Sequence, residues 1–224
     1  MTTEETYKTY PHNPPHLFRR GGKYFITGAT YEHRRYMRTS ASKDSFVHYL
    51  SISFNHFNWE IEDWVVLDNH YHLMVNAPEN VNTLSEMMNN LHRFSAIAIR
   101  KILKSDLECI ECANRVGTAL TQSVHSRGKN CVGTTLTQSV YSRDSKDYQK
   151  KIFHNYWDTC INYEKSWYAR LHYIWFNPVK HGYVNHPWEW KWGSFYKRWQ
   201  EDRERMLEIM SDYPCDRVNV YDDF

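Results

Sequence analysis

The spacing of hydrophobic residues in the first hundred positions predicts a strand, a helix and then a β-hairpin. Residues 24–30 are rich in strand-forming residues, whereas Phe46, Leu50 and Phe54 recur at helical spacing within residues 43–58. Two further β-branched and aromatic runs, residues 61–67 and 70–75, flank Asp68-Asn69. Asp and Asn favour turns, so these two runs predict a hairpin.

Helical spacing returns twice later in the chain. Thr83-Leu84-Ser85-Glu86 is a capping-box sequence, and the helical spacing that follows predicts a second helix over residues 84–104. Residues 164–177 predict a third helix that ends before Pro178, because proline disfavours helical geometry at the residue before it. This order of elements predicts an α+β fold, in which helices pack on an antiparallel sheet.

The segment at about 105–150 differs from its surroundings and contains a duplication. Residues 116–127 recur as 132–143 with ten of twelve positions identical. Its low apolar content and its Gly, Ser and Thr residues predict a loop or solvent-facing hairpin inserted into one domain, residues 1–200. Cys109, Cys112, His125 and Cys131 match no tight zinc spacing, so we favour free thiols over a zinc knuckle.

Composition restricts the class of protein. The 224 residues are 41% hydrophobic, enough for one core, yet no run approaches 18 apolar residues and residues 1–10 are polar. Five cysteines give no even disulfide framework. We therefore expect a soluble, intracellular (cytoplasmic) protein that has no membrane partner.

Charge is distributed unevenly along the chain. Residues 1–200 hold 25 Lys and Arg against 18 Asp and Glu, whereas residues 201–224 hold 3 against 8 and form an acidic C-terminal tail. A basic body with 16% aromatic residues suits single-stranded nucleic acid, in which phosphates meet cations and bases stack on rings. A solvated surface of mixed charge is the alternative.

Two pairs of residues are candidates for chemistry. His70 and His72 lie two positions apart in a predicted strand, so their side chains share one face and could bind one cation. Tyr173 and Asn177 lie one turn apart on the third helix, with Arg170 near the same face. Histidines and a tyrosine that simply pack in a core remain the alternative for both pairs.

Three segments in this order resemble the single-tyrosine HUH transposases, and among them the REP-associated tyrosine transposases. They are residues 64–72 (WVVLDNHYH), 156–158 (YWD) and 173–184 (YIWFNPVKHGYV). Residues 22–27 and 188–194 extend the resemblance over nearly the whole chain, which departs from the family at residues 105–150 and in its acidic tail. The resemblance implies the ferredoxin-like or RRM-like core of HUH endonucleases.

The resemblance also implies an enzyme and assigns roles to its residues. It implies a metal-dependent single-stranded DNA endonuclease and strand transferase that acts on hairpin-forming repeats. His70, His72 and Asn177 would bind Mg²⁺ or Mn²⁺, and Tyr173 would attack DNA to form a 5′-phosphotyrosine. Three neutral ligands leave the cation its full charge, and a phenol with a pKa of about 10 makes a reversible phosphodiester link.

Basic side chains outside these pairs are candidates for binding phosphates of DNA. They flank the first strand, decorate the second helix or precede Tyr173: Arg19, Arg20, Lys23, Arg34, Arg35, Arg93 and Arg170. Tryptophans at 188–199 could stack on bases, but we favour their packing on the core. Two other functions remain open, namely a non-catalytic module that binds single-stranded nucleic acid and a histidine-metal hydrolase. The sequence leaves open a monomer or a homodimer.

Overall fold

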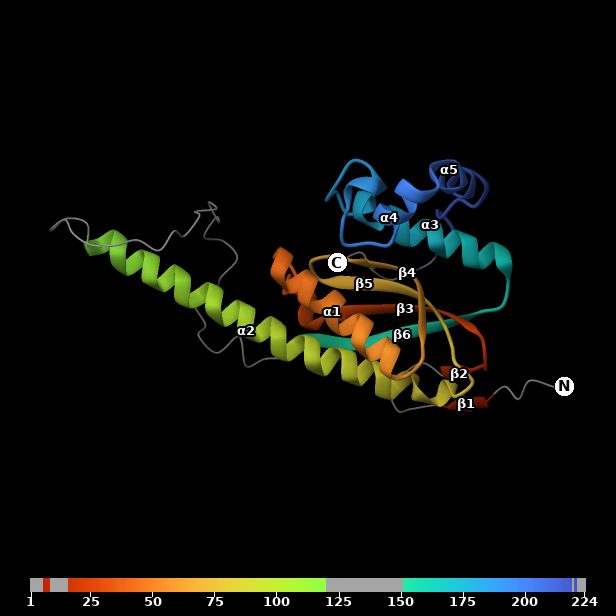
Figure 1. Cartoon of the computed structure of the whole chain (residues 1–224), viewed down its shortest axis with the longest axis horizontal. Coiled ribbons are helices and arrows are strands. Elements are labelled where there is room, and N and C mark those ends of the chain that lie inside the picture. The colour runs from red at the N-terminus through yellow and green to blue at the C-terminus, as the bar shows by residue number, and fades with distance from the viewer. Residues whose placement is uncertain (1–5, 9–15, 120–150, 219, 221–224) are drawn as a thin grey trace. The chain divides into compact units, whose positions relative to one another are not determined.

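The computed structural model describes residues 6–8, 16–119, 151–218 and 220 (Figure 1). Its elements, in chain order, are β1 (Thr6–Lys8), β2 (His16–Phe18), β3 (Lys23–Thr30), η1 (Tyr31–His33), α1 (Ser40–His56), β4 (Glu60–Val66), β5 (His70–Asn76), η2 (Val81–Thr83), α2 (Leu84–Ala119), β6 (Phe153–Ile161), α3 (Glu164–Lys180), η4 (Pro187–Glu189), α4 (Phe195–Glu201) and α5 (Arg203–Asp212). Residues 1–99 and 151–224 form one compact unit, and residues 100–150 form a second.

A four-stranded antiparallel sheet organises the first unit. The strand order is β4-β5-β3-β6, so the hairpin of β4 and β5 lies next to β3, and β6 forms one edge. Thr27 pairs with His72 and Ala29 with His70 in the β3–β5 register. The predicted strand and hairpin and the α+β class are confirmed, and the two histidines lie on a central strand.

Helices cover both faces of this sheet (Figure 1). On one face, Tyr71 of β5 packs against Phe46 of α1 and His92 of α2. On the other face, Phe25 and Met74 join a core with residues of α3, including Leu171 and Ile174. Because side chains alternate along a strand, the fully buried Tyr71 faces the first core, whereas His70 and His72 face α3.

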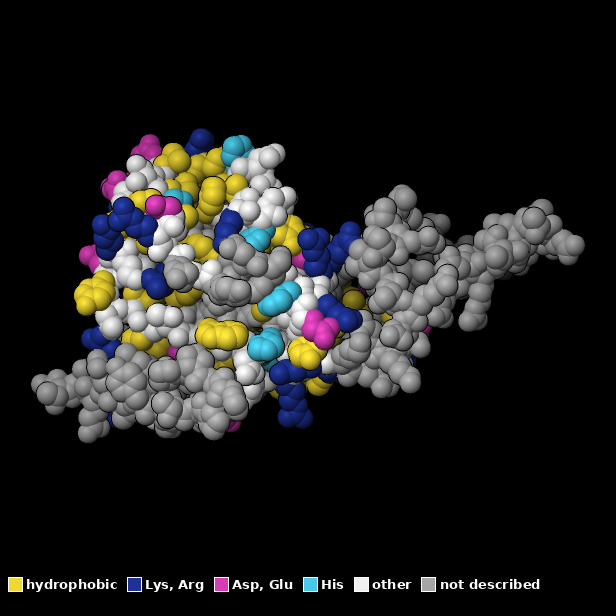
Figure 2. Space-filling model, turned by 180° about the vertical axis from the view of Figure 1, so that it is seen from behind, with side chains coloured by type: hydrophobic (Ala, Val, Ile, Leu, Met, Phe, Trp, Pro, Cys, Tyr) yellow, Lys and Arg dark blue, Asp and Glu magenta, His cyan; other side chains and the backbone are white. Residues whose placement is uncertain are grey.

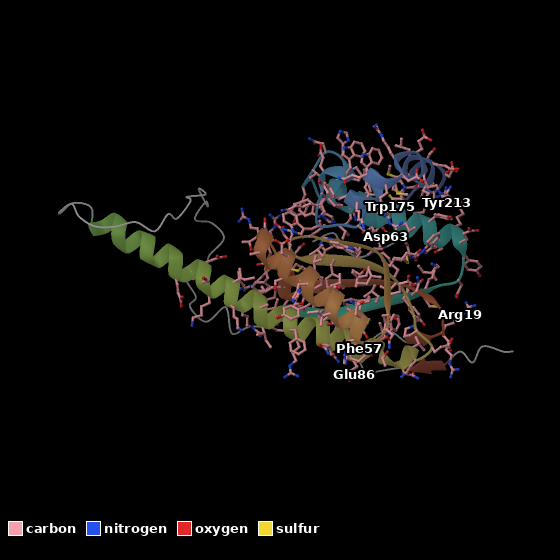
Figure 3. The ribbon with its side chains drawn as sticks, viewed as in Figure 1. Arg19, Phe57, Asp63, Glu86, Trp175 and Tyr213 are labelled. Carbon is pink, nitrogen blue, oxygen red and sulfur yellow. The ribbon has the colours of Figure 1, made fainter. Side chains whose placement is uncertain are left out.

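The C-terminal region packs on α3 and against β4. Trp175 and Arg198 both bond the buried Asp63, with Nε1–Oδ1 at 2.8 Å and Nη2–Oδ2 at 2.8 Å, and Figure 3 shows Asp63 beside Trp175. Trp190 and Phe195 are buried in the same core, and Trp188, Trp192 and Trp199 pack against it. The prediction that these aromatic residues pack on the core is therefore confirmed.

Two helices extend beyond their predicted ends. Helix α3 continues through Pro178 to Lys180 and stops at Gly182, whose φ of +69° suits a residue with no Cβ. Helix α2 continues fifteen residues past 104, since Leu107 maintains the helical spacing and no glycine or proline occurs before Gly117. Part of the segment predicted as a loop from 105 is therefore helical.

Several other predicted features fall partly or wholly outside the described residues. Residues 120–150 of the insert, with most of the duplication and with His125 and Cys131, lie there, whereas Cys160 and Cys215 are described. Within the segment whose charge marks an acidic tail, α5 buries Met206 and Ile209. No helix in the described part of the chain has both the length and the apolar character that crossing a membrane requires.

Candidate active site

The turn between β4 and β5 is fixed from several sides. The buried Asp68 accepts a hydrogen bond from Lys43 Nζ at 2.6 Å, and this ammonium also donates to the Arg38 carbonyl at 3.0 Å. The carbonyl oxygen of Asn69 accepts from the backbone N–H of Thr30 at 2.8 Å. These bonds hold the backbone immediately before His70 in one conformation.

Each histidine has a polar neighbour at Nδ1. The Asn69 side chain donates from Nδ2 to the His33 carbonyl at 3.4 Å, which turns its Oδ1 toward His70 Nδ1 at 2.8 Å. Since an amide oxygen can only accept, this contact places a hydrogen on His70 Nδ1. For His72, the neighbour at Nδ1 is the Thr27 hydroxyl, at 2.9 Å. Such bonds orient an imidazole so that Nε2 can act as a ligand.

Helix α3 brings Tyr173 and Asn177 to the two histidines. The rings of Tyr173 and His72 have centroids 5.3 Å apart and meet edge to face, and Asn177 Oδ1 lies 3.2 Å from His70 Nε2. All four side chains are buried, with exposed fractions of 5% or less. Residues that lie a hundred positions apart in the sequence thus form one cluster, as their proposed roles require.

The last turn of α3 adds two further groups. Lys180 Nζ donates to the Tyr173 hydroxyl at 3.3 Å, and the His181 ring lies 4.8 Å from that of His70, centroid to centroid. An ammonium at this position stabilises negative charge on the phenol oxygen. Lys180 follows Tyr173 by two helical turns and therefore shares its face, which is the sequence signal that could have identified it.

The arrangement of His70 and Asn177 fits a bound cation. With a hydrogen already on Nδ1, a neutral His70 presents a lone pair at Nε2, and this lone pair faces another on the amide oxygen at 3.2 Å. A cation placed between these two atoms would be bound by both of them. Adjacent ligands of an octahedral cation with bonds of about 2.1 Å are separated by about 3 Å, which is close to this distance.

The proposed metal site would contain no acidic ligand. Among the described residues, no group of three or more His, Cys, Asp or Glu side chains is placed to hold a metal ion. A site here would consist of His70, His72 and the amide of Asn177. Imidazole and amide oxygen both bind Mn²⁺, while Mg²⁺ prefers oxygen.

The predicted DNA-binding residues lie in three kinds of environment. Arg20, Arg35 and Arg93 are exposed, and Arg170 is half-buried beside the Phe25 ring. Three others bond protein groups, namely Lys23 with Glu62 at 2.8 Å, Arg34 with Glu32 at 3.0 Å and Arg19 with Asn162 at 3.0 Å. The first group is the better placed to meet phosphates, because a cation already paired must exchange one partner for another.

Sequence reasoning did not assign roles to Thr27, Asn69, Lys180 or His181. Asn69 was interpreted only as a turn residue, although its position next to His70 allows its side chain to reach the imidazole. Thr27 meets His72 through the strand register, which no local pattern reveals.

Comparisons with known proteins agree with this geometry. The family model described as "Transposase IS200 like" matches residues 23–110, which include both histidines. A Haemophilus influenzae protein described as a REP-associated tyrosine transposase is 24% identical over 184 residues, covering 80% of this chain and 83% of that protein. A solved REP-associated tyrosine transposase bound to a REP hairpin aligns with a TM-score of 0.54 and 18% identity, covering 98% of this chain and 94% of that one. The resemblance found in the sequence is thus confirmed: the chain is similar in sequence and in fold to the REP-associated tyrosine transposases, and this similarity supports a transposase role.

Proposed function

We propose that this protein is a metal-dependent single-stranded DNA endonuclease and strand transferase that acts on hairpin-forming repeat DNA. The observation that carries the proposal is the cluster in which Tyr173 meets His72 while Asn177 meets His70. A tyrosine that only filled the core would not require two buried histidines and an amide around it. Buried polar side chains cost free energy unless they are satisfied, so such a cluster favours a site.

In the proposed reaction, the Tyr173 oxygen attacks the phosphorus of a DNA phosphodiester. The new bond joins the phenol oxygen to phosphorus, the bond from phosphorus to O3′ breaks, and the products are a 5′-phosphotyrosine and a free 3′-OH. The phenol loses its proton and the leaving O3′ gains one, and the Lys180 ammonium beside the phenol oxygen stabilises the charge that develops there. A divalent cation held by His70, His72 and Asn177 would supply positive charge for the scissile phosphate.

The substrate class rests on the relatives. The solved neighbour is described as bound to a REP hairpin, and we extend that kind of partner to this chain. The exposed Arg20, Arg35 and Arg93 supply cations for phosphates, and such contacts make binding weaken as salt rises.

A covalent-adduct assay tests this proposal. Labelled DNA hairpins with single-stranded flanks are incubated with the protein and Mn²⁺ or Mg²⁺ and resolved on denaturing gels. We expect a protein–DNA adduct that disappears with EDTA and with Tyr173→Phe. The control is Tyr163→Phe, which changes an exposed tyrosine directly before α3 and should form as much adduct as wild type.

Other outcomes of the assay would favour the other functions. Hairpin binding with no adduct would favour a non-catalytic nucleic-acid-binding module. Metal-dependent hydrolysis that Tyr173→Phe leaves unchanged would favour a histidine-metal hydrolase. An adduct of undiminished yield with Tyr173→Phe would show that another residue is the nucleophile.

A further inference from the structure

A cavity lies beside the tyrosine–histidine cluster, between β3, β6 and the side of α3 that carries Arg170. Its volume is about 590 Å³, within the range of sites that bind small molecules. Phe25 and Thr27 line it from β3, and Trp157 lines it from β6. Figure 2, which views the molecule from behind Figure 1, shows histidine side chains beside hydrophobic and basic ones on that face.

The cavity and the cluster share a wall. The Phe25 ring stacks on His72, with centroids 5.5 Å apart, and meets the Tyr173 ring edge to face at 6.2 Å. Thr27 lines the cavity and also bonds His72 through its hydroxyl. A group bound in the cavity would therefore lie within one side chain of the residues proposed to act on DNA.

One wall of the cavity is a flat aromatic surface. The Trp157 side chain is 49% exposed, although tryptophan is usually well buried. Its ring lies nearly parallel to that of His154, with an interplanar angle of 5° and centroids 5.9 Å apart. An exposed indole in a concave site offers a face on which a planar ring can stack.

Arg170 provides a planar cation that also lines the cavity. Its guanidinium lies over the Phe25 ring at 5.7 Å and donates to the Ser166 carbonyl and hydroxyl. Its Nε is buried and has no hydrogen-bond partner in the described part of the chain. Glu32, an acidic residue that also lines the cavity, is paired with Arg34 at 3.0 Å. A guanidinium so placed suits a ligand that brings both an acceptor and negative charge.

We propose that this cavity holds one unpaired DNA nucleotide next to the phosphodiester that Tyr173 attacks. The base stacks on Trp157, and Arg170 donates to the base edge or to the adjoining phosphate. The proposal rests on the proposed function, and it adds a reason for selecting single strands, since a paired base cannot leave its stack to enter without an energetic cost. A nucleotide suits both side chains, because it combines a planar ring that can stack on Trp157 with a phosphate that Arg170 can bind.

Binding of short single strands tests the cavity without requiring cleavage. Fluorescein-labelled (dT)12, (dA)12 and (dC)12 are titrated with the protein and followed by fluorescence anisotropy. Stacking on an aromatic side chain contributes about 1–3 kcal/mol per base, so Trp157→Ala should weaken binding of at least one oligonucleotide roughly 5- to 150-fold. Trp157→Phe should retain most of the affinity, since it keeps a ring.

The matched control is Tyr163→Ala, which removes a more exposed aromatic side chain, 76% exposed, that does not line the cavity. It should bind all three oligonucleotides like wild type. Circular dichroism and thermal melts establish that each variant is folded. Equal affinities of folded Trp157→Ala and wild type for all three oligonucleotides would overturn the proposal.

The adduct assay separates this proposal from the proposed function. Wherever wild type cleaves a hairpin, a single abasic site is moved along its single-stranded flank, and one position beside the cleaved bond should slow wild type but not Trp157→Ala. If adducts form and Trp157→Ala loses neither affinity nor rate, the cavity proposal fails alone. If no adduct forms while Trp157→Ala still weakens binding of single strands, the proposed reaction fails, whereas binding of an unpaired base in the cavity is supported.

Discussion

The orientation of the His70 ring depends on the side chain of Asn69, which has no catalytic role in the proposed reaction. Asn69 is held by its bond to the His33 carbonyl and by the backbone of Thr30, and its Oδ1 then fixes which nitrogen of His70 carries hydrogen. Asp68 anchors the same turn through Lys43, and both side chains of this ion pair are at least 93% buried. A buried pair of this kind is weak evidence for stability, whereas the position of Asp68 two residues before His70 indicates a positioning role.

Lys180 should contribute to catalysis through its contact with the Tyr173 hydroxyl. Lys180→Gln removes the ammonium beside the Tyr173 oxygen and should slow adduct formation roughly 100-fold, which is typical of losing one group that stabilises transition-state charge. Affinity for the hairpin should change little, and Lys180→Arg should restore much of the rate. Single-turnover adduct rates and binding titrations measure the two effects separately.

The control for this prediction is Lys165→Gln, which removes an exposed lysine from the first turn of the same helix. It removes the same charge at the opposite end of the helix. If it slows adduct formation as much as Lys180→Gln does, the effect comes from net charge rather than from contact with the phenol.

At the scale of elements, strand β3 and strand β5 are joined by an unusually close contact. A Cβ on Gly28 would lie 2.2 Å from the ring and hydroxyl of Tyr71, the residue between the two histidines. Tyr71 is fully buried and its hydroxyl contacts His92 Nε2 at 2.6 Å, so its ring cannot move aside to make room for a Cβ on Gly28. The glycine thus leaves room for the Tyr71 ring where β5, the strand that carries the histidines, pairs with β3.

Gly28→Ala should therefore lower the free energy of unfolding by about 1–3 kcal/mol, as overpacking of a core does. Gly193→Ala is the matched control, because its Cβ would meet its nearest atom at an ordinary 3.4 Å. Urea titrations of both variants measure the difference, and the penalty for Gly28→Ala should shrink when Tyr71 is also replaced by Leu. Equal stabilities of Gly28→Ala and wild type would show that the two strands separate without cost.

The central elements could be predicted because their patterns are local. The strand-forming runs at 24–30 and 70–75, which are buried along almost their whole length, and the helical spacing in 84–104 can each be read from neighbouring residues. Strand β6 alternates between exposed and partly exposed positions along most of its length, so its sequence shows no hydrophobic pattern. The continuation of helix α3 through Pro178 depends on backbone hydrogen bonds from residues after the helix, such as that from the Tyr183 N–H to the Pro178 carbonyl. Asn69 and Thr27 meet the histidines through turn and register, which are tertiary properties.

At the scale of the whole first unit, acid should destabilise the fold through His92. The His92 ring stacks on Phe153 at 4.7 Å and touches the Tyr71 hydroxyl, and burial, aided by the charge of Lys151, lowers its pKa from 6.5 to about 3. In the unfolded chain the same imidazole titrates near 6.5. Between these values the unfolded state binds a proton that the folded state does not, so stability falls as pH decreases below about 6.5.

The expected loss between pH 7 and pH 4 is up to about 3 kcal/mol from this residue, since each pKa unit corresponds to about 1.4 kcal/mol. His92→Gln keeps an acceptor for Tyr71 but cannot titrate, so its urea midpoint should depend less on pH than that of wild type. His48→Gln, on the exposed face of α1, should retain the wild-type dependence. His172, whose pKa burial also lowers, adds to the loss in all three proteins, whereas Asp63, whose pKa burial raises, opposes it. The comparison therefore depends on the difference between His92→Gln and wild type, and identical pH profiles for the two would mean that His92 takes up its proton without unfolding.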